Sequence, residues 1–279
     1  MLADPTDSTG AKKALVRTYD PPGYADPWDC VQDYERVQRA AAEHPNKGSQ
    51  ALSSVVELPR SRIRPWLDGA QPDCYRGLQT ALNRGWILDS WSSDAARTLN
   101  RLAAWLLASG SVSHQTRVPD FVVETSAQED RLLGYFETFD LRPRVVTRDG
   151  KPDEWIPRSD ASILGRVLQT WTGLDGDKTS LDTRFPEYLQ YAPVGIARGF
   201  AETYVSLRAT VRTDRGDRLQ IQAERSEYFR QQLIELLSRV VDPDEIRGDS
   251  WPVYLVDDAA FQLFNPDLAG YEADDVFSQ

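Results

Sequence analysis

The chain has 279 residues, of which 41% are hydrophobic and 10% are aromatic. This length and composition allow more than one folded domain with a buried core, and they exclude a largely disordered chain. The 43 acidic residues outnumber the 32 basic residues, and the net charge is −11. Such an acidic balance argues against nucleic acid as a partner unless the charge is unevenly distributed.

The charge is in fact uneven along the chain. Residues 241–279 carry ten acidic residues and one Arg, whereas residues 1–240 carry 33 acidic and 31 basic residues. Only five basic residues are Lys, and abundant Asp with few Lys resembles the composition of proteins from extreme halophiles. We therefore expect local basic faces in the first 240 residues and a solvated acidic tail at 271–279.

The sequence predicts a cytoplasmic protein. The amino terminus is acidic and polar, so it does not resemble a signal peptide, and no apolar run approaches the length of a membrane span. Cys30 and Cys74 have no metal-binding spacing, so we expect two reduced thiols.

The first 90 residues divide into an expected tail and a helical segment. Residues 1–28 are rich in Asp, Pro and Gly without apolar periodicity, which predicts a flexible tail. The pattern in residues 29–90 predicts four short helices. Their expected bounds are 33–43, 50–56 with Ser49 as its cap, 60–68 with a start near Arg62 because of Pro65, and 73–84.

The second and third of these predicted helices form a helix-turn-helix pattern, and residues 60–86 resemble helix-turn-helix segments of haloarchaeal proteins. In such a unit the second helix lies in the major groove of DNA and its first residues contact base edges. The candidates for these contacts are Arg60, Ser61, Arg62 and Arg64. The alternative is a small helical bundle with exposed arginines that binds no nucleic acid.

Residues 93–279 contain a pattern that occurs twice. An apolar helical stretch at 102–112 corresponds to one at 197–207, and two later pairs of segments also correspond, at offsets of 95, 100 and 98 residues. A duplicated unit of this length predicts one pseudo-symmetric domain rather than a solenoid of short repeats. We expect repeats at 93–174 and 190–270.

Each repeat reads as helix, two strands, helix, two strands and helix, which resembles the LAGLIDADG homing endonuclease family. The resemblance implies an α+β fold in which two signature helices pack through small residues. These would be Ala103, Ala104 and Ala108 in the first copy and Gly199 in the second.

In that family each signature helix ends in an Asp that binds a catalytic metal ion. Here Ser109 and Tyr204 stand at those positions, and Glu202 alone remains of the two preceding acidic positions. Because Mg²⁺ is bound by carboxylates and water, the resemblance implies a retained scaffold that has lost nuclease activity. No metal ion or other cofactor is expected.

Alternating polar and apolar residues from position 206 predict a half-buried strand, with a partner after a turn at 214–217. The exposed face of this pair would carry Ser206, Arg208, Thr210, Arg212, Arg218, Gln220 and Gln222. A weaker version in the first repeat comprises Ser111, Ser113, Gln115, Arg117, Arg142, Arg144 and Arg148. In the endonuclease family such sheets form a saddle over the major groove, so the resemblance implies that these side chains contact DNA. An ordinary solvated sheet face is the alternative.

The sequence thus predicts a non-catalytic, sequence-specific double-stranded DNA-binding protein that regulates transcription. We expect a monomer, because the duplication supplies its own symmetry, and we expect no membrane or small-molecule partner. Two alternatives stay open. One is an active metal-dependent nuclease that uses Glu202, Asp214 or Asp217, and the other is a protein-interaction scaffold that does not bind DNA.

Overall fold

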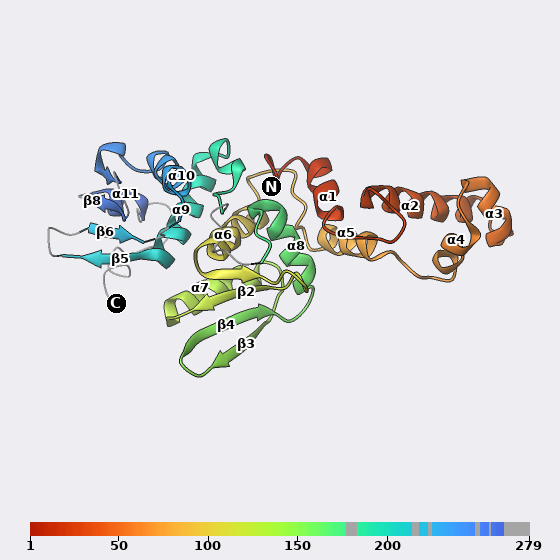
Figure 1. Ribbon diagram of the computed structural model, residues 1–279, viewed down its shortest axis with the longest axis horizontal. Coiled ribbons are helices and arrows are strands. Elements are labelled where there is room, and N and C mark those ends of the chain that lie inside the picture. Colours follow the sequence, from red (N-terminus) through yellow and green to blue (C-terminus); the bar gives the residue numbers. More distant parts are fainter. Residues whose placement is uncertain (177–182, 214–217, 223–224, 249–251, 257, 265–279) are drawn as a thin grey trace.

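The computed structural model describes residues 1–176, 183–213, 218–222, 225–248, 252–256 and 258–264. It is a mixed α+β structure in which a helical arm extends from a body with two antiparallel sheets (Figure 1). The turn expected at 214–217 and the acidic tail expected at 271–279 lie outside the described residues. Among the helices that are described, none combines the length and the hydropathy needed to cross a membrane.

The helical arm consists of five helices. They are α1 (Ser8–Val16), α2 (Pro27–Glu43), α3 (Ser49–Val56), α4 (Arg60–Leu67) and α5 (Asp73–Asn83). Four helices are present where the sequence predicts them, but α2 begins at Pro27 rather than Asp33, and Gly48 rather than Ser49 precedes α3. Helix α4 begins at Arg60, not near Arg62, and therefore contains Pro65. Pro65 has no backbone N–H to donate within α4, and Ile63 and Trp66 are the buried residues of this helix.

The body contains two successive sets of helices and strands. The first set is α6 (Asp94–Ser109), β1 (Gly110–Val112), β2 (Pro119–Val123), α7 (Ser126–Glu137), β3 (Pro143–Arg148), β4 (Lys151–Pro157) and α8 (Ala161–Thr172). The second set is α9 (Val194–Arg208), β5 (Ala209–Arg212), β6 (Arg218–Ile221), α10 (Glu227–Ser238), β7 (Ile246–Arg247), β8 (Val253–Val256) and α11 (Ala259–Leu263), with short 3₁₀ helices at Glu187–Gln190 and Pro243–Glu245.

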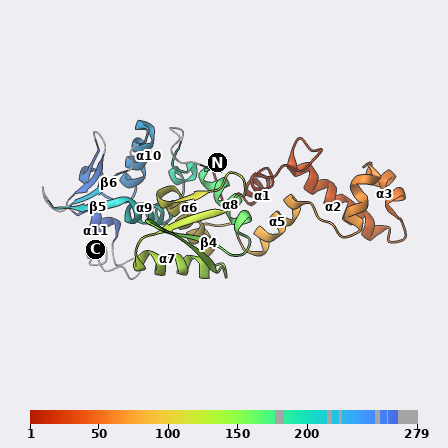
Figure 2. The same ribbon diagram turned by 60° about the horizontal axis from the view of Figure 1, so that its bottom comes forward.

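The two sheets have the same internal strand order. Sheet A has the order β1-β2-β4-β3, sheet B has the order β5-β6-β8-β7, and all neighbouring strands are antiparallel. One face of each sheet is buried beneath helices: α6, α7 and α8 contact β2, while α10 contacts β7 and α11 contacts β8. Figure 2 shows α7 running alongside β4. We call the opposite face of each sheet its outward face.

Helices α6 and α9 make the most extensive contact between any two elements of the body (Figure 1). Asn100 on α6 is buried, donates to the Ile196 carbonyl of α9 at 2.9 Å, and accepts from the Tyr188 hydroxyl at 2.8 Å. Buried small residues on both helices allow close approach: Ala103, Ala104, Ala108, Ala197 and Ala201. The prediction that Gly199 is needed for helix packing is not supported. A Cβ at this position would lie 3.5 Å from the nearest atom, in the Arg101 side chain, which is an ordinary van der Waals distance.

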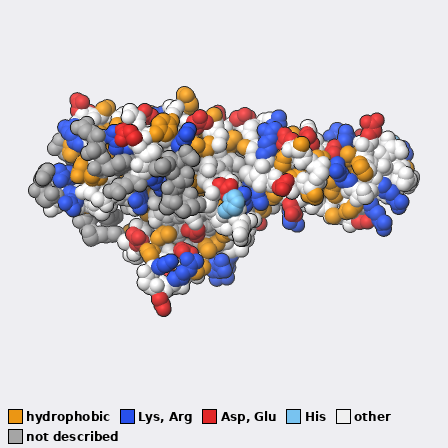
Figure 3. Space-filling view, viewed as in Figure 1, with side chains coloured by type: hydrophobic (Ala, Val, Ile, Leu, Met, Phe, Trp, Pro, Cys, Tyr) orange, Lys and Arg blue, Asp and Glu red, His pale blue; other side chains and the backbone are white. Residues whose placement is uncertain are grey.

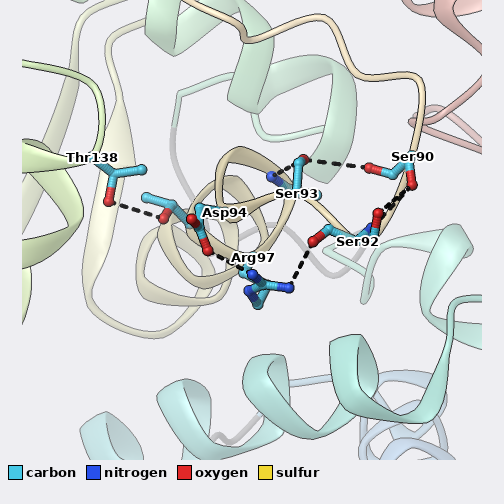
Figure 4. A network of polar contacts seen from close by, with 8 residues as sticks. Ser90, Ser92, Ser93, Asp94, Arg97 and Thr138 are labelled. Atoms are coloured by element: carbon cyan, nitrogen blue, oxygen red, sulfur yellow. Dashed lines mark hydrogen bonds and ion pairs between the residues drawn. The ribbon is translucent and has the colours of Figure 1, made fainter.

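A polar network fixes the first turn of α6. The Ser93 hydroxyl accepts the Ala96 N–H at 3.1 Å and so caps the helix. Arg97 donates to Asp94 at 2.6 Å and to the Ser92 carbonyl at 2.8 Å, while Thr98 reaches Thr138 beyond the end of α7 at 3.3 Å (Figure 4). These contacts set where α6 begins relative to its neighbours.

The prediction of a flexible tail at residues 1–28 is wrong. Helix α1 buries Ala11, Leu15 and Val16, and the Asp7 side chain caps it by accepting two backbone N–H groups. This helix packs against α5 and α8. Nine residues with three buried positions give too little periodicity to be distinguished from a loop by pattern alone.

The arm is fastened to the body at α5 and α8. Arg84, which follows α5, lies 2.7 Å from the carboxylate of Asp160 and donates to the Phe139 carbonyl at 3.0 Å. The Trp86 ring packs edge-on against Phe139. Helices α3 and α4 lie at the far end of the arm, away from sheet B (Figure 1).

Helix α9 is longer than predicted, which shifts the correspondence between the two halves. It continues through Ser206 and Arg208, and strand β5 starts only at Ala209. Tyr204 is therefore one turn inside the helix, and Arg208 rather than Tyr204 stands where Ser109 ends α6. Ser206 and Arg208 alternate with apolar residues as strand residues would, but so short a stretch of alternation does not exclude one more helical turn.

Candidate nucleic-acid interface

The outward face of sheet B gathers several basic and polar side chains. Cross-strand pairing places Arg212 beside Arg218, and Thr210 beside Gln220. Further along the sheet Gln220 pairs with Tyr254, which pairs with Arg247. The alternate residues are buried on the other face: Leu219, Ile221, Val253 and Leu255. The strand alternation predicted for Thr210, Arg212 and Arg218 is therefore confirmed in register.

Contacts within this face order its side chains. The Arg218 guanidinium lies 4.6 Å from the centroid of the Tyr254 ring, a distance typical of a cation–π contact. Gln220 is only 8% exposed, so the prediction of an open side chain is wrong at this position. It lies on the central strand β6, where it pairs with Thr210 of β5 and with Tyr254 of β8. Thr210 and Arg212 remain exposed.

Two predicted contact residues instead connect structural elements. Arg208 donates to the Gln222 carbonyl at 2.7 and 3.2 Å, so it joins the end of α9 to the end of β6. The half-buried Ser206 hydroxyl donates to the Thr203 carbonyl and accepts from Arg131 of α7 at 2.8 Å. Their place in α9 rather than in a strand explains why neither belongs to the sheet face, whereas Gln222 is exposed just after β6.

The outward face of sheet A carries acidic as well as basic side chains. Ser111 donates to Asp120 on the neighbouring strand, and Arg148 pairs with Glu154 at 2.7 Å. Arg144 is exposed opposite Ile156. Lys and Arg side chains gather over the β3–β4 hairpin, with an acidic side chain at its tip (Figure 3). The positive charge of this face is therefore partly neutralised.

The remaining predicted residues of the first repeat do not lie along a strand. Ser113, Gln115 and Arg117 form the tight turn between β1 and β2, closed by the Arg117 N–H to the Ser113 carbonyl at 2.8 Å. Arg117 also pairs with Asp175, and its φ is 58°. Arg142 is exposed just before β3, and its carbonyl accepts the Arg158 N–H. Strand β1 is shorter than predicted because residues after Val112 turn back towards β2.

On α4, the predicted residues point in different directions. Arg60, Ser61 and Arg64 are exposed. Arg60 donates to the Ser49 hydroxyl at 3.2 Å, and Arg64 lies 3.8 Å from Asp68. Arg62 instead stacks 4.4 Å from the Tyr24 ring centroid, so it faces the loop between α1 and α2. The sequence could not separate these directions because residues 60–64 cover more than one helical turn.

The metal ion implied by the endonuclease resemblance does not fit the ends of α6 and α9. The helices end in Ser109 and Arg208, and Arg225 donates to the Leu107 carbonyl at 3.4 Å. The Tyr204 hydroxyl is buried, and burial raises the pKa of Tyr204 to about 12. A hydroxyl, a phenol and guanidinium groups are not the carboxylate ligands that Mg²⁺ requires. Within the described residues, no three His, Cys, Asp or Glu side chains cluster as metal ligands.

Glu202, the remaining acidic residue of the signature, lies nearly two turns before the end of α9. It lines a cavity of about 650 Å³ together with Arg101 and Arg198. Burial raises the pKa of its carboxyl group, and the nearby arginines oppose that rise. Asp214 and Asp217, the other candidate ligands, lie outside the described residues.

Two members of the sheet B face, Arg247 and Tyr254, were not predicted from the sequence. The apolar alternation of Val253 and Leu255 could have placed Tyr254 outward. Strand β7 has only two residues, so it offered no pattern for Arg247. No protein-family model matches the chain, and the comparison with curated proteins returned no match.

Proposed function

We propose that this protein binds double-stranded DNA through the outward face of sheet B and does not cleave it. The observation that carries the proposal is the side-chain set of that face: Arg212, Arg218, Arg247, Tyr254 and Thr210. Arginines neutralise phosphates and read guanine edges, and hydroxyl groups contact bases or phosphates.

The pairing of the two halves supports the proposal. Identical strand orders on either side of α6 and α9 are what a duplicated LAGLIDADG-like scaffold would have. In such a scaffold the two outward faces lie side by side, so sheet A would extend the contact started by sheet B. Ser109 and Arg208 at the helix ends support binding without metal-dependent cleavage.

Helix α4 is the second proposed contact. Arg60 and Arg64 are exposed on the helix that follows the tight turn, where a helix-turn-helix protein contacts DNA. Helix α4 and sheet B lie at opposite ends of the long axis (Figure 1). We propose that they engage separate segments of a duplex, and that the protein regulates transcription.

The test is selection of bound fragments from randomised duplex in high KCl, followed by affinity measurements on the enriched sequence. Arg212→Gln with Arg218→Gln should weaken binding by about 1–3 kcal/mol per base-reading contact and reduce the sequence preference. Arg144→Gln with Arg148→Gln is the charge-matched comparison in sheet A. The sheet A double variant should lose less binding free energy, because Arg148 already pairs with Glu154.

Three outcomes would contradict the proposal. If no sequence is enriched, a protein-interaction scaffold that does not bind DNA becomes the favoured interpretation. Equal losses for the two double variants would remove sheet B as the main contact. Cleavage of plasmid with Mg²⁺ or Mn²⁺ that is abolished by Glu202→Ala would establish the nuclease alternative.

A further inference from the structure

A cavity of about 590 Å³ lies where the arm meets the body. Residues of the α1–α2 loop, α2, α4, α5 and α8 line it. Its wall combines polar side chains with aromatic rings and prolines, namely Tyr19, Tyr24, Trp66, Pro21 and Pro72. Small-molecule sites are typically cavities of about 300–1,000 Å³ at joints between units, with apolar walls and a few polar groups.

Two guanidinium groups are held at this cavity by stacking. Arg62 of α4 lies 4.4 Å from the Tyr24 ring centroid and 3.4 Å from the Gly23 carbonyl oxygen. Arg166 of α8 lies 4.0 Å from the Tyr19 ring centroid and donates to the Thr18 carbonyl. Stacking on a ring leaves the edge of a guanidinium group available for hydrogen bonds.

The charges around the cavity leave an excess of positive charge. Neither Arg62 nor Arg166 has a carboxylate within ion-pair distance among the described residues. Of the two acidic residues in the wall, Asp73 pairs with Arg76 at 2.7 Å, and Asp20 is exposed. Two arginines against one unpaired carboxylate favour an anionic ligand.

We propose that this cavity binds a planar organic anion, an aromatic carboxylate. The rings and prolines of the wall would contact the aromatic ring of the ligand, and its carboxylate would accept hydrogen bonds from Arg62 or Arg166. The site is a second binding site, and the proposal does not depend on DNA binding. Because Arg62 belongs to α4 and Arg166 to α8, the ligand links the arm to the body.

The experiment is calorimetric titration of the whole chain with benzoate, 1-naphthoate and indole-3-acetate, each compared with its neutral amide. At least one carboxylate should bind saturably, about tenfold or more tightly than its amide. Arg62→Gln and Arg166→Gln should each weaken that binding by about tenfold. Arg39→Gln, an exposed arginine of α2 outside the cavity, is the matched control and should leave it unchanged.

Hydrogen exchange gives an independent readout of the same site. The bound carboxylate should slow amide exchange in α4 and in residues 19–24 of the wild type but not of Arg62→Gln. Thermal melting of both arginine variants checks that each still folds. The proposal is overturned if no carboxylate binds at about 10 mM, if acid and amide bind equally, or if both folded variants bind as the wild type does.

Discussion

Sheets A and B share a strand order but differ in what their outward faces carry. On sheet A, Arg148 pairs with Glu154 and Ser111 donates to Asp120, so acidic groups partly neutralise the positive charge of its outward face. The described strands of sheet B carry Arg212, Arg218, Arg247 and Tyr254 on their outward face. The shared backbone arrangement fixes where each outward face lies, while the side chains on that face fix its charge and polarity. Nucleic-acid binding is therefore expected to be asymmetric between the halves.

The largest expected effect is a loss of stability when the packed core of either half is disrupted. Phe121 in sheet A and Phe229 in α10 are both fully buried. Replacement of either by Ala should lower the free energy of unfolding by about 3–5 kcal/mol. Urea unfolding followed by circular dichroism should show one transition that either variant shifts, because α6 and α9 join the halves. Two unfolding transitions, each shifted by only one of the variants, would show that the halves unfold independently and would contradict this expectation.

The joint itself can be tested at Asn100. Asn100→Leu would leave the buried Tyr188 hydroxyl and the Ile196 carbonyl without their partner. We expect a loss of about 2–4 kcal/mol in the free energy of unfolding. Tyr188→Phe removes one of the two hydrogen bonds and should cost about half as much. An Asn100→Leu variant as stable as the wild type would show that this contact does not hold the helices together.

A variant with increased DNA affinity would test the proposed difference between the outward faces of sheets A and B. Glu154→Gln removes an acidic group from the outward face of sheet A and releases Arg148. Affinity for the enriched duplex should rise about threefold at low salt, and the gain should shrink as salt increases. Glu137→Gln on α7, which lies against the buried side of sheet A, makes the same charge change and is the control. An equal gain in both variants would indicate a long-range charge effect only.

The smallest expected effect is a pH dependence that arises at Glu202. Burial raises the pKa of this carboxyl group in the folded protein, so the folded state holds the proton more tightly than the unfolded state. Wild-type stability relative to Glu202→Gln should therefore decline as the pH rises from about 4.5 through the folded pKa. Urea unfolding between pH 4 and 7 measures the difference. A difference independent of pH would contradict the burial of an ionisable group there.

The sequence predicted more of the fold than of the candidate site. The α+β class and the helices that became α2 to α5 follow from apolar periodicity and from stop signals such as Gly85 after α5. Helix α1 was missed because three buried residues cannot be recognised before their partners on α5 and α8 are known.

The candidate site depends on side-chain directions and on the exact end of α9, which the pattern of polar and apolar residues does not determine. Arginine is a residue type that often contacts DNA, so Arg62 was a candidate. The direction of its side chain, however, depends on a contact with Tyr24, which is 38 residues earlier in the chain. Arg208 and Ser206 were displaced from the sheet face by one extra turn of α9. Thr210, Arg212 and Arg218 were placed as predicted, because period-two alternation survives wherever one face of a strand is buried.

The most direct measurement is cross-linking of a photoreactive duplex of the enriched sequence, with the attached peptides identified by mass spectrometry. We expect cross-links in β5, β6 and β8, around Arg212, Arg218 and Tyr254, and fewer in β3 and β4. Cross-links confined to α10 and α11, on the covered side of sheet B, would contradict it.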